Sequence, residues 1–228
     1  MARLTWAVVS SVVKPEFGPT LPELVGPRLR ALPRGGQVAV GALAAAVVAA
    51  LLWLVFLKDD GRTPLVVRGP FAFNLLYDDS KLERVAPQAG EALRLQTPAT
   101  EADPESFAVR AVRLPAYTGD ASGVLPGFAT GLIEQMRAAD PQFILRAEGR
   151  ARVNSQPGYQ IQFQTTRDGR TTYGRRTLLF KDEPGERDGA DITLIAARSP
   201  AIPNVDQVGS NGPVKLPYRS FRLGTERP

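Results

Sequence analysis

The pattern of apolar and polar residues divides the chain into one long apolar run and a series of shorter alternating segments. The run extends from Val38 to Leu57 (VAVGALAAAVVAALLWLVFL) and has no charged residue in its twenty positions. A helix rises roughly 1.5 Å per residue, so one of this length just crosses a hydrocarbon core about 30 Å thick. Residues 38–57 therefore predict a transmembrane helix, through which the protein would contact the lipid bilayer.

Two other interpretations of this run fit less well. A soluble helix of a small domain normally keeps a polar face, and this run has none. A cleavable signal peptide has an apolar stretch of about 7–15 residues followed by small residues at the cleavage site. Here the run is longer, starts at residue 38 and is followed by Lys58-Asp59-Asp60. We therefore expect an uncleaved signal anchor.

Beyond residue 64, apolar positions mostly alternate with polar ones, as they do in strands that bury one face. Strands are predicted over residues 65–68, 71–77, 93–97, 107–114, 143–153, 159–166, 171–180 and 191–197. A helix is predicted over residues 125–139, whose apolar side chains recur at helical spacing, namely Leu125, Phe128, Ala129, Leu132, Ile133 and Met136. Such strands predict an α+β fold, an antiparallel β-sheet with helices packed on it.

The dipeptide Asp168-Gly169 predicts a tight hairpin between the strands at 159–166 and 171–180. The alternation predicts that Tyr159, Ile161 and Phe163 are buried and that Gln160, Gln162 and Gln164 are exposed. A two-residue turn places Arg176 opposite Ile161, whereas a three-residue turn places Arg175 there. In either register an arginine approaches the apolar face. Two placements of this arginine are open. It lies at the margin of the sheet with its guanidinium group in water, or it is buried beside an anionic partner.

The composition excludes several classes of function. The 228 residues include neither cysteine nor histidine, which excludes disulfides, Ser-His-Asp and Cys-His hydrolases, thiolate redox centres and ordinary zinc sites. A metal could be held by oxygen ligands alone, and the chain has no Gly-rich phosphate loop or dinucleotide-binding motif. We expect no resident metal or cofactor.

The formal charge of +5 is unevenly distributed along the chain. Residues 1–37 carry five basic and two acidic side chains, whereas residues 58–228 carry 23 basic and 21 acidic ones. A nucleic-acid-binding domain concentrates its basic excess in the folded part, so we expect no nucleic-acid partner. Arg28, Arg30 and Arg34 are grouped before the apolar run. They favour a cytoplasmic N-terminus, although the basic residues after the run make the two flanks nearly equal.

Four parts are expected: a Pro-rich cytoplasmic arm (1–37), the transmembrane helix (38–57), a linker (58–64) and an extracytoplasmic α+β domain (65–228). The expected location is the cell membrane, which the chain would cross once. Within the helix, small residues recur every four positions, namely Gly41, Ala45 and Ala49. This spacing lets membrane helices approach closely and predicts a weak homodimer. An alanine-rich run also produces it by chance.

The order of these elements, together with two short motifs, resembles a known family of domains. The motifs are Phe71-Ala72-Phe73 near the start and Ser220-Phe221-Arg222-Leu223 at the end. Over residues 65–224 the chain resembles the PsbP-like family of α/β/α sandwich domains, and the actinobacterial LpqN-type lipoproteins are similar in plan. The resemblance implies a non-catalytic binding or assembly module. The chain departs from this plan where the closing helix is interrupted by Gly209, Gly212, Pro213 and Pro217.

Arginines are concentrated in the second half of the predicted domain. The candidate site residues are Arg146, Arg150 and Arg152, which the alternation places on one face of the strand at 143–153, and Arg175 and Arg176 in the hairpin, whose turn adds Arg167 and Arg170. Together they would form a basic patch for phosphate, for lipid headgroups or for an acidic protein of the cell envelope. The alternative is an ordinary solvated strand face, since Glu148 interrupts the row.

The segment Asp78-Asp79-Ser80-Lys81 carries the other candidate chemistry. Paired carboxylates, or a serine facing a lysine, would supply acid–base or nucleophilic chemistry, but this composition is also that of an ordinary turn. The sequence therefore predicts a non-enzymatic single-pass membrane protein that presents a binding or assembly module. The alternative is a membrane-anchored hydrolase that uses Ser, Lys and carboxylate groups, and a third hypothesis is a subunit of an envelope assembly.

Overall fold

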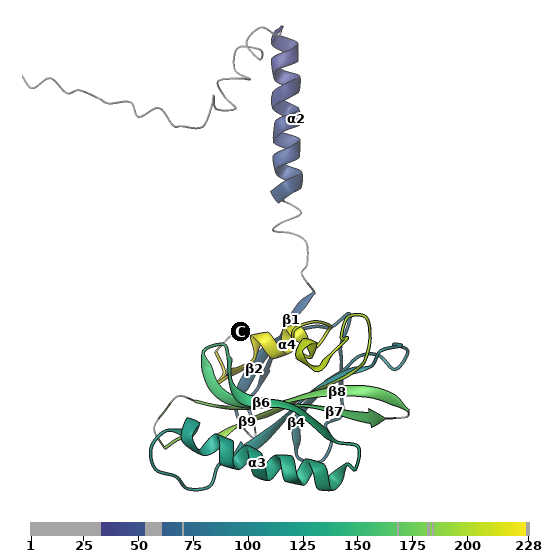
Figure 1. Ribbon diagram of the computed structural model, residues 1–228. Helices are drawn as coiled ribbons and strands as arrows, with labels where there is room; N and C mark the ends of the chain where they lie inside the picture. The colour runs from purple at the N-terminus through teal and green to yellow at the C-terminus, as the bar shows by residue number, and fades with distance from the viewer. Residues whose placement is uncertain are drawn as a thin grey trace, which may run out of the picture. The chain divides into compact units, whose positions relative to one another are not determined.

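In a computed structural model of the protein, the described residues are 33–52, 61–69, 71–167, 169–181, 183 and 185–226. The chain divides into two compact units, Met1–Asp59 and Asp60–Pro228. The described part of the first unit is the helix α2 (Arg34–Leu52), and the second unit has the α+β fold (Figure 1).

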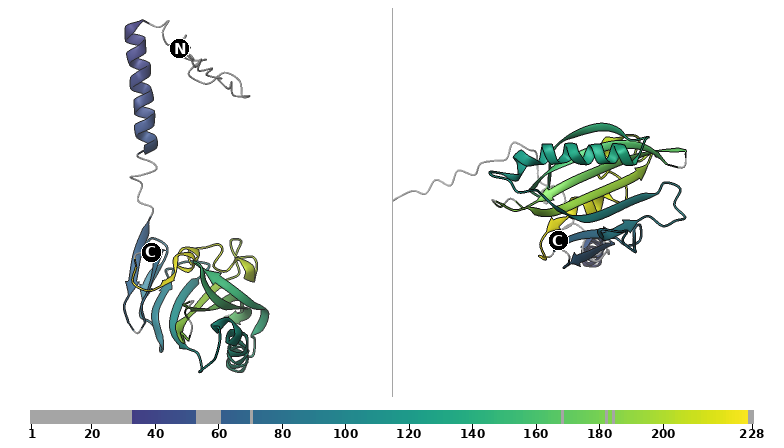
Figure 2. Two further views of the ribbon diagram at one scale, coloured as in Figure 1. Left: turned by 90° about the vertical axis from the view of Figure 1, so that its left-hand side faces the viewer. Right: turned by 90° about the horizontal axis from the view of Figure 1, so that it is seen from below.

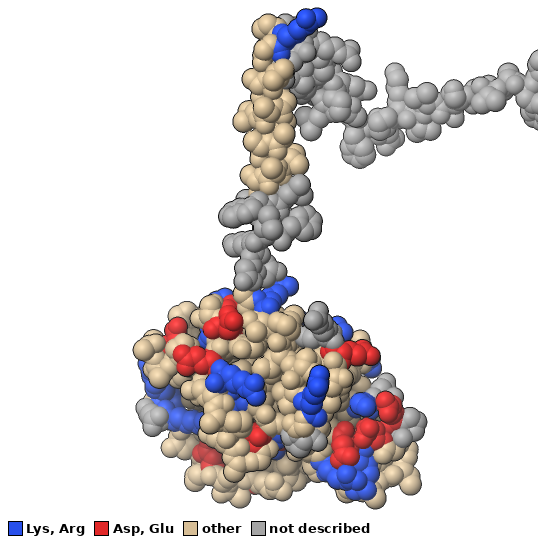
Figure 3. All heavy atoms as spheres, turned by 180° about the vertical axis from the view of Figure 1, so that it is seen from behind, with Lys and Arg blue, Asp and Glu red and all other residues tan. Residues whose placement is uncertain are grey.

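The helix α2 coincides with most of the predicted transmembrane span. Its residues Arg34–Leu51 are long and apolar enough to cross a membrane, and none of them is buried. Val38 and Leu43 are 72% and 67% exposed, and Figure 3 shows α2 without charge beyond its first turn. Apolar side chains in such a position are stabilised by an apolar environment. The remaining residues of the predicted span, 53–57, lie outside the described residues.

The second unit is built on a seven-stranded antiparallel sheet with the order β3-β4-β5-β9-β8-β7-β6, and a smaller sheet has the order β1-β2-β10. The strands are β1 (Arg62–Val67), β2 (Phe73–Asp78), β3 (Glu83–Val85), β4 (Glu91–Gln96), β5 (Glu105–Arg113), β6 (Ile144–Val153), β7 (Gln156–Arg167), β8 (Arg170–Phe180), β9 (Asp188–Ala197) and β10 (Arg222–Leu223). The α+β class is confirmed, and every predicted strand is present. The strand β3 has three residues, too few to show an alternation.

The helix α3 (Ala121–Ala139) covers one face of the large sheet (Figures 1 and 2). Its buried residues recur every four positions, namely Leu125, Ala129 and Ile133. They pack against apolar side chains of β7 and β8, among them Ile161, Phe163, Leu178 and Phe180. The helix begins earlier than predicted, so Pro126 lies beyond its first turn. The carbonyl group left without its helical hydrogen bond belongs to Ser122, which is exposed to water.

The opposite face of the large sheet carries the small sheet and the helix α4 (Lys215–Ser220) (Figure 1). The core between the two sheets contains fully buried side chains, among them Phe73, Leu75, Phe107, Leu194 and Phe221. The rings of Phe73 and Phe221 stack with 5.3 Å between their centroids. Because β10 pairs with β2, the end of the chain completes the sheet that its beginning starts.

The C-terminal segment is interrupted as its glycines and prolines predict. It forms the short 3-10 helix η2 (Val205–Gln207) and the six-residue α4, with Gly209 and Gly212 between them at φ +75° and +74°. This left-handed conformation favours glycine and ends a helix. Packing also requires Gly212 to be glycine, because a Cβ there would lie 2.2 Å from Oε1 of Glu105.

The β7–β8 hairpin has the two-residue turn that the Asp-Gly dipeptide predicts. Arg167 pairs with Arg170, and Ile161 pairs with Arg176. Arg176 does not lie at the sheet margin, because β8 is flanked by β7 and β9. Its Nε donates to Oδ1 of Asp191 on β9 at 2.9 Å, and the two side chains are 18% and 5% exposed. The arginine on the apolar face is therefore compensated by a buried carboxylate from the adjacent strand.

The strand β7 is buried on both faces, which its alternation does not predict. Tyr159, Ile161 and Phe163 lie in the core beneath α3, as expected. Gln162, predicted to be exposed, is 5% exposed. The reason is that the C-terminal segment around η2 packs against the second face of β7, so the glutamine faces protein instead of water.

Removing one partner of the Arg176–Asp191 pair is expected to destabilise the fold. Arg176→Met leaves the Asp191 carboxylate buried and uncompensated, which we expect to lower the free energy of unfolding by about 3 kcal/mol. The double variant Arg176→Met/Asp191→Leu should lose less than either single variant. Urea unfolding followed by circular dichroism measures these differences. As a control, Arg113→Met breaks an ion pair whose side chains are 64% and 58% exposed, and it should cost less than about 1 kcal/mol. Equal losses at the two sites would contradict the prediction.

Glu105, at the start of β5, is a buried carboxyl group beneath the C-terminal segment. It is 7% exposed, and its Oε2 accepts a hydrogen bond from the backbone N–H of Val214 at 3.4 Å. Burial raises the pKa of Glu105 from 4.5 to about 7, against the opposing effect of the Val214 hydrogen bond and with a further contribution from Asp103. Between about pH 4.5 and pH 7, the folded chain therefore keeps a proton on Glu105 that the unfolded chain has released.

This raised pKa predicts that the contribution of Glu105 to the free energy of unfolding is greatest below about pH 4.5 and falls as the pH rises to about 7. Glu105→Gln removes the titration, so it should stabilise the protein at pH 8 by about 3 kcal/mol, from a pKa raised from 4.5 to about 7 at about 1.4 kcal/mol per pKa unit, and have little effect at pH 4. The measurement is the urea midpoint of both proteins across this pH range. Parallel pH profiles for the two proteins would contradict the prediction.

Candidate functional site

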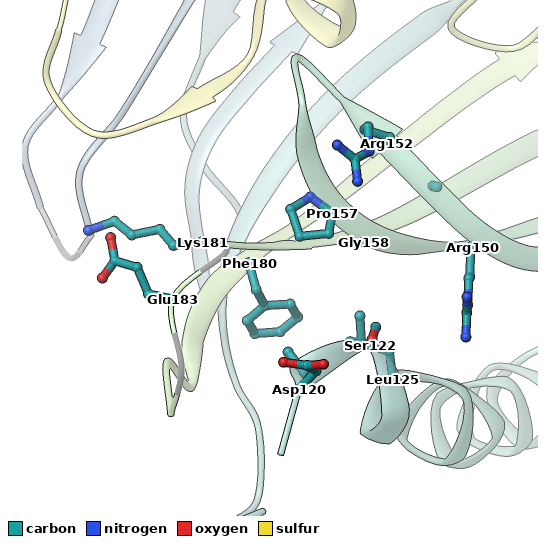
Figure 4. A pocket seen from close by; sticks show the side chains of 12 residues that line it. Asp120, Ser122, Leu125, Arg150, Arg152, Pro157, Gly158, Phe180, Lys181 and Glu183 are labelled. Carbon is teal, nitrogen blue, oxygen red and sulfur yellow. The ribbon is translucent and has the colours of Figure 1, made fainter. Parts of the chain in front are cut away.

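A cavity of about 560 Å³ lies where α3 begins, beside the edge strand β6 (Figure 4). We call it the α3 cavity. It is lined by Asp120, Ala121, Ser122, Leu125, Arg150, Ala151, Arg152, Pro157, Gly158, Phe180, Lys181 and Glu183. These residues come from the first turn of α3, from the β6–β7 hairpin and from the end of β8, so only the folded chain brings them together.

The α3 cavity combines an apolar floor with a charged rim. Leu125 and Phe180 are 1% and 0% exposed and belong to the core beneath α3. In Figure 4, Arg150 lies on one side of these two residues, and Lys181 and Glu183 lie on the other. Arg150, Arg152 and Lys181 bring three positive charges to the lining, against the carboxylates of Asp120 and Glu183. Such a site suits a ligand that has an apolar part and an anionic group with a single negative charge.

A second cavity, of about 450 Å³, lies on the opposite side of β6, next to α4. We call it the α4 cavity. It is lined by Arg150, Ala151, Arg152, Val153, Asn154, Gln160, Arg175, Tyr218 and Arg219. Arg150 and Arg152 border both cavities because β6 is the last strand of the sheet. Sequence reasoning missed Arg219, because nothing local in the sequence indicates that α4 packs beside the hairpin.

The five predicted arginines do not share one face of the sheet. Arg150 pairs with Tyr159 and Arg152 with Pro157, which places both on the α3 side. A bulge between Leu145 and Ala147 interrupts the alternation of β6. Arg146 therefore lies on the other face, where its Nε donates to Oε1 of Gln164 at 3.2 Å. The predicted common face of these three arginines is wrong for this reason.

The two hairpin arginines separate in the same way, because neighbouring residues of a strand point to opposite faces. Arg176 is engaged by Asp191 beneath α3, whereas Arg175 lines the α4 cavity. Arg170, near the hairpin turn, donates from Nη1 to the carbonyl of Ala102 at 3.0 Å. The turn at 168–169 is at the opposite end of β7 from the β6–β7 hairpin. The structure thus brings Arg150, Arg152 and Arg175 to one cavity and leaves the others apart.

The segment Asp78-Asp79-Ser80-Lys81 forms a turn held by its first carboxylate. Asp78 accepts hydrogen bonds from the backbone N–H of Ser80 at 3.1 Å and from its hydroxyl at 2.6 Å, and it pairs with Lys81 at 2.8 Å. Lys81 and Ser80 lower the pKa of Asp78, which makes it a weak proton acceptor. The hydroxyl of Ser80 and the ammonium group of Lys81, the candidate nucleophile and base, are both directed at Asp78. This geometry is that of a turn-stabilising aspartate, and it gives the hydrolase alternative no support.

Among the described residues, no group of three or more Asp or Glu side chains is placed to hold a metal ion. The acidic residues of the α3 cavity are two, Asp120 and Glu183.

No protein-family model matches the chain, and no match is found among curated protein sequences. Among solved structures, LpqN, involved in cell envelope biogenesis of Mycobacterium tuberculosis, matches with a TM-score of 0.48 and 15% identity over 73% of this chain and 94% of LpqN. The cyanobacterial PsbP of Synechocystis matches with a TM-score of 0.48 and 13% identity over 74% of this chain and 95% of that chain. These are the two kinds of protein that the order of elements resembles, and the likeness concerns the fold alone.

Proposed function

We propose that the protein is a single-pass membrane protein of the cell envelope that binds a small amphiphilic anion in the α3 cavity without catalysing a reaction on it. In this proposal, residues 38–57 cross the bilayer, residues 1–37 lie in the cytoplasm, and the α+β unit lies outside. The observation that carries the proposal is the lining of the α3 cavity, an apolar floor beneath a cationic rim.

The floor of the cavity provides the apolar part of the interaction. Leu125 and Phe180 are closed to water beneath it, and the half-buried Ala121, Ala151 and Pro157 supply the apolar surface that an alkyl chain would cover, at roughly 25 cal/mol per Å² removed from water. The volume of about 560 Å³ falls within the range of about 300–1,000 Å³ found for small-molecule sites.

The rim limits the charge of the ligand. Arg150, Arg152 and Lys181 attract an anion and the carboxylates of Asp120 and Glu183 repel it, so the lining has a net charge of +1, which balances one negative charge. A carboxylate on an alkyl chain therefore fits the cavity better than a phosphate dianion does.

Anchoring is supported by α2, whose side chains from residue 38 to residue 51 are apolar and unburied. Arg34 at its first residue belongs to the basic group that favours a cytoplasmic N-terminus. The small residues Gly41, Ala45 and Ala49 lie at four-residue spacing on α2, and we propose weak self-association through them. Membership of an envelope assembly would be a further role of the same anchored unit.

The binding experiment uses residues 60–228, since both hydrophobic cores consist of residues of this unit. Titration with decanoate, followed by calorimetry, should show saturable binding, and decanol should bind at least tenfold more weakly because it lacks the charge. Arg150→Gln should weaken decanoate binding about tenfold, which corresponds to about 1.4 kcal/mol. Arg137→Gln, on the far end of α3, is the control and should bind as the unchanged protein does. Equal affinities for decanoate and decanol would contradict the proposed ligand class.

The proposed topology places a reporter fused after Pro228 outside the cytoplasm. Fused alkaline phosphatase should be active, because it folds outside the cytoplasm, and fused green fluorescent protein should be dark when exported in the unfolded state. The full chain should also sediment with membranes and be released by detergent. A fluorescent C-terminal fusion without phosphatase activity would place the α+β unit in the cytoplasm.

A further inference from the structure

We infer that the α4 cavity is a second binding site, separate from the α3 cavity, and that it takes a phosphate group carrying two negative charges. Arg175 and Arg176 are adjacent residues of β8 that lie on opposite faces of the sheet and differ in their partners. Arg176 is paired with Asp191 and is neutralised within the protein. Arg175 forms no ion pair with any described residue, although it is also partly buried.

The guanidinium of Arg175 has open donors. Its Nη2 donates to the backbone carbonyl of Asp206 at 3.0 Å, which supplies no charge. Its Nε is sealed from solvent and has no hydrogen-bond partner among the described residues. Its Nη1 is not sealed and has no hydrogen-bond acceptor among the described residues, so an anion in the cavity can accept a charge-assisted hydrogen bond from it.

The same guanidinium is held in a defined place. Its central carbon lies 5.7 Å from the centroid of the Tyr218 ring, a distance at which a cation is attracted to the ring face. Tyr218 is 6% exposed, and its hydroxyl lies 3.1 Å from Oγ1 of Thr177. The position of Arg175 is therefore set by α4 and by β8 itself, before any ligand binds.

The surroundings of Arg175 favour a dianion over a single negative charge. Arg219 on α4 lines the cavity beside Arg175, Arg150 and Arg152 border it from the edge strand with their side chains on the α3 side, and none of its nine lining residues is acidic. None of these four arginines is ion-paired with a described residue. Guanidinium groups match the geometry of phosphate oxygens and bind them through paired N–H donors. The α3 cavity, whose lining includes two carboxylates, lacks this bias.

The hairpin and the C-terminal segment are tied together beside this site. Asn154, at the tip of the β6–β7 hairpin, donates from Nδ2 to the carbonyl of Phe221 at 2.9 Å. This contact and the Arg175–Asp206 hydrogen bond hold the two walls of the cavity at a fixed separation. The arginines therefore meet a ligand without a rearrangement of the backbone.

The test is titration of the full chain in a non-ionic detergent, near pH 8, where a phosphate ester is a dianion. Inorganic phosphate and glycerol 3-phosphate are the two probes, and sodium chloride of equal ionic strength is the reference. Saturable calorimetric binding of both probes identifies a site for phosphate itself. Binding of glycerol 3-phosphate alone identifies a site for a headgroup ester. Saturation by neither probe above the chloride reference overturns the inference.

Variants separate this site from other basic residues and from the α3 cavity. Arg175→Lys keeps the charge but removes the planar guanidinium with its Nη1 donor, and it should weaken phosphate binding at least fivefold. Arg219→Gln, an exposed substitution on α4, should weaken it by a smaller factor, about threefold. Arg170→Lys, at the first residue of the same strand and outside the α4 cavity, is the matched control and should leave the phosphate affinity unchanged.

The cross-test uses Lys181→Gln, which changes the α3 cavity alone. It should leave phosphate binding intact, and Arg175→Lys should leave decanoate binding intact, so failure of either site is recognised independently of the other. Arg175→Lys that is folded by circular dichroism and binds phosphate as tightly as the unchanged protein would overturn the inference. If Arg175→Lys does not fold, the Arg219→Gln result decides, and an unchanged affinity there overturns it as well.

Discussion

The register of the β7–β8 hairpin is the constraint on which the positions of the charged groups depend. Because Arg167 pairs with Arg170, Arg176 faces α3 and Arg175 faces α4. A slip of one residue would exchange these faces. It would leave the buried Asp191 carboxylate without its partner and place Arg175 in the apolar layer beneath α3. The Arg176–Asp191 pair thus stabilises one register against its nearest competitor, as well as the fold against unfolding.

The two cavities follow from the way in which the sheet is covered. One face of the sheet carries α3, and the other carries the small sheet and the C-terminal segment, but β6 is the last strand and most of its residues remain exposed. Both cavities therefore border β6 and share Arg150 and Arg152. They differ in their other walls. The α3 cavity rests on core side chains and includes two carboxylates, whereas the α4 cavity has polar walls and no acidic residue.

The two cavities therefore suit different ligands. In the functions proposed, the α3 cavity accepts an apolar chain with a single negative charge, and the α4 cavity accepts a phosphate dianion. The turn at Asp78 has a structural role instead, since its serine and lysine both bind the aspartate that precedes them.

The features that depend on near neighbours in the chain could be predicted from the residues alone: the strands and α3, the α+β class, the apolar run of α2 and the two-residue hairpin turn. Periodicity and turn chemistry are local, so these could be predicted. The common face of Arg146, Arg150 and Arg152 could not, because a bulge in β6 changes the alternation by one residue. Only the tertiary structure supplied Asp191 to Arg176, brought Arg219 beside Arg175 and buried Gln162. Those contacts join strands and helices far apart in the chain, and only the packing of the folded layers decides which of them meet.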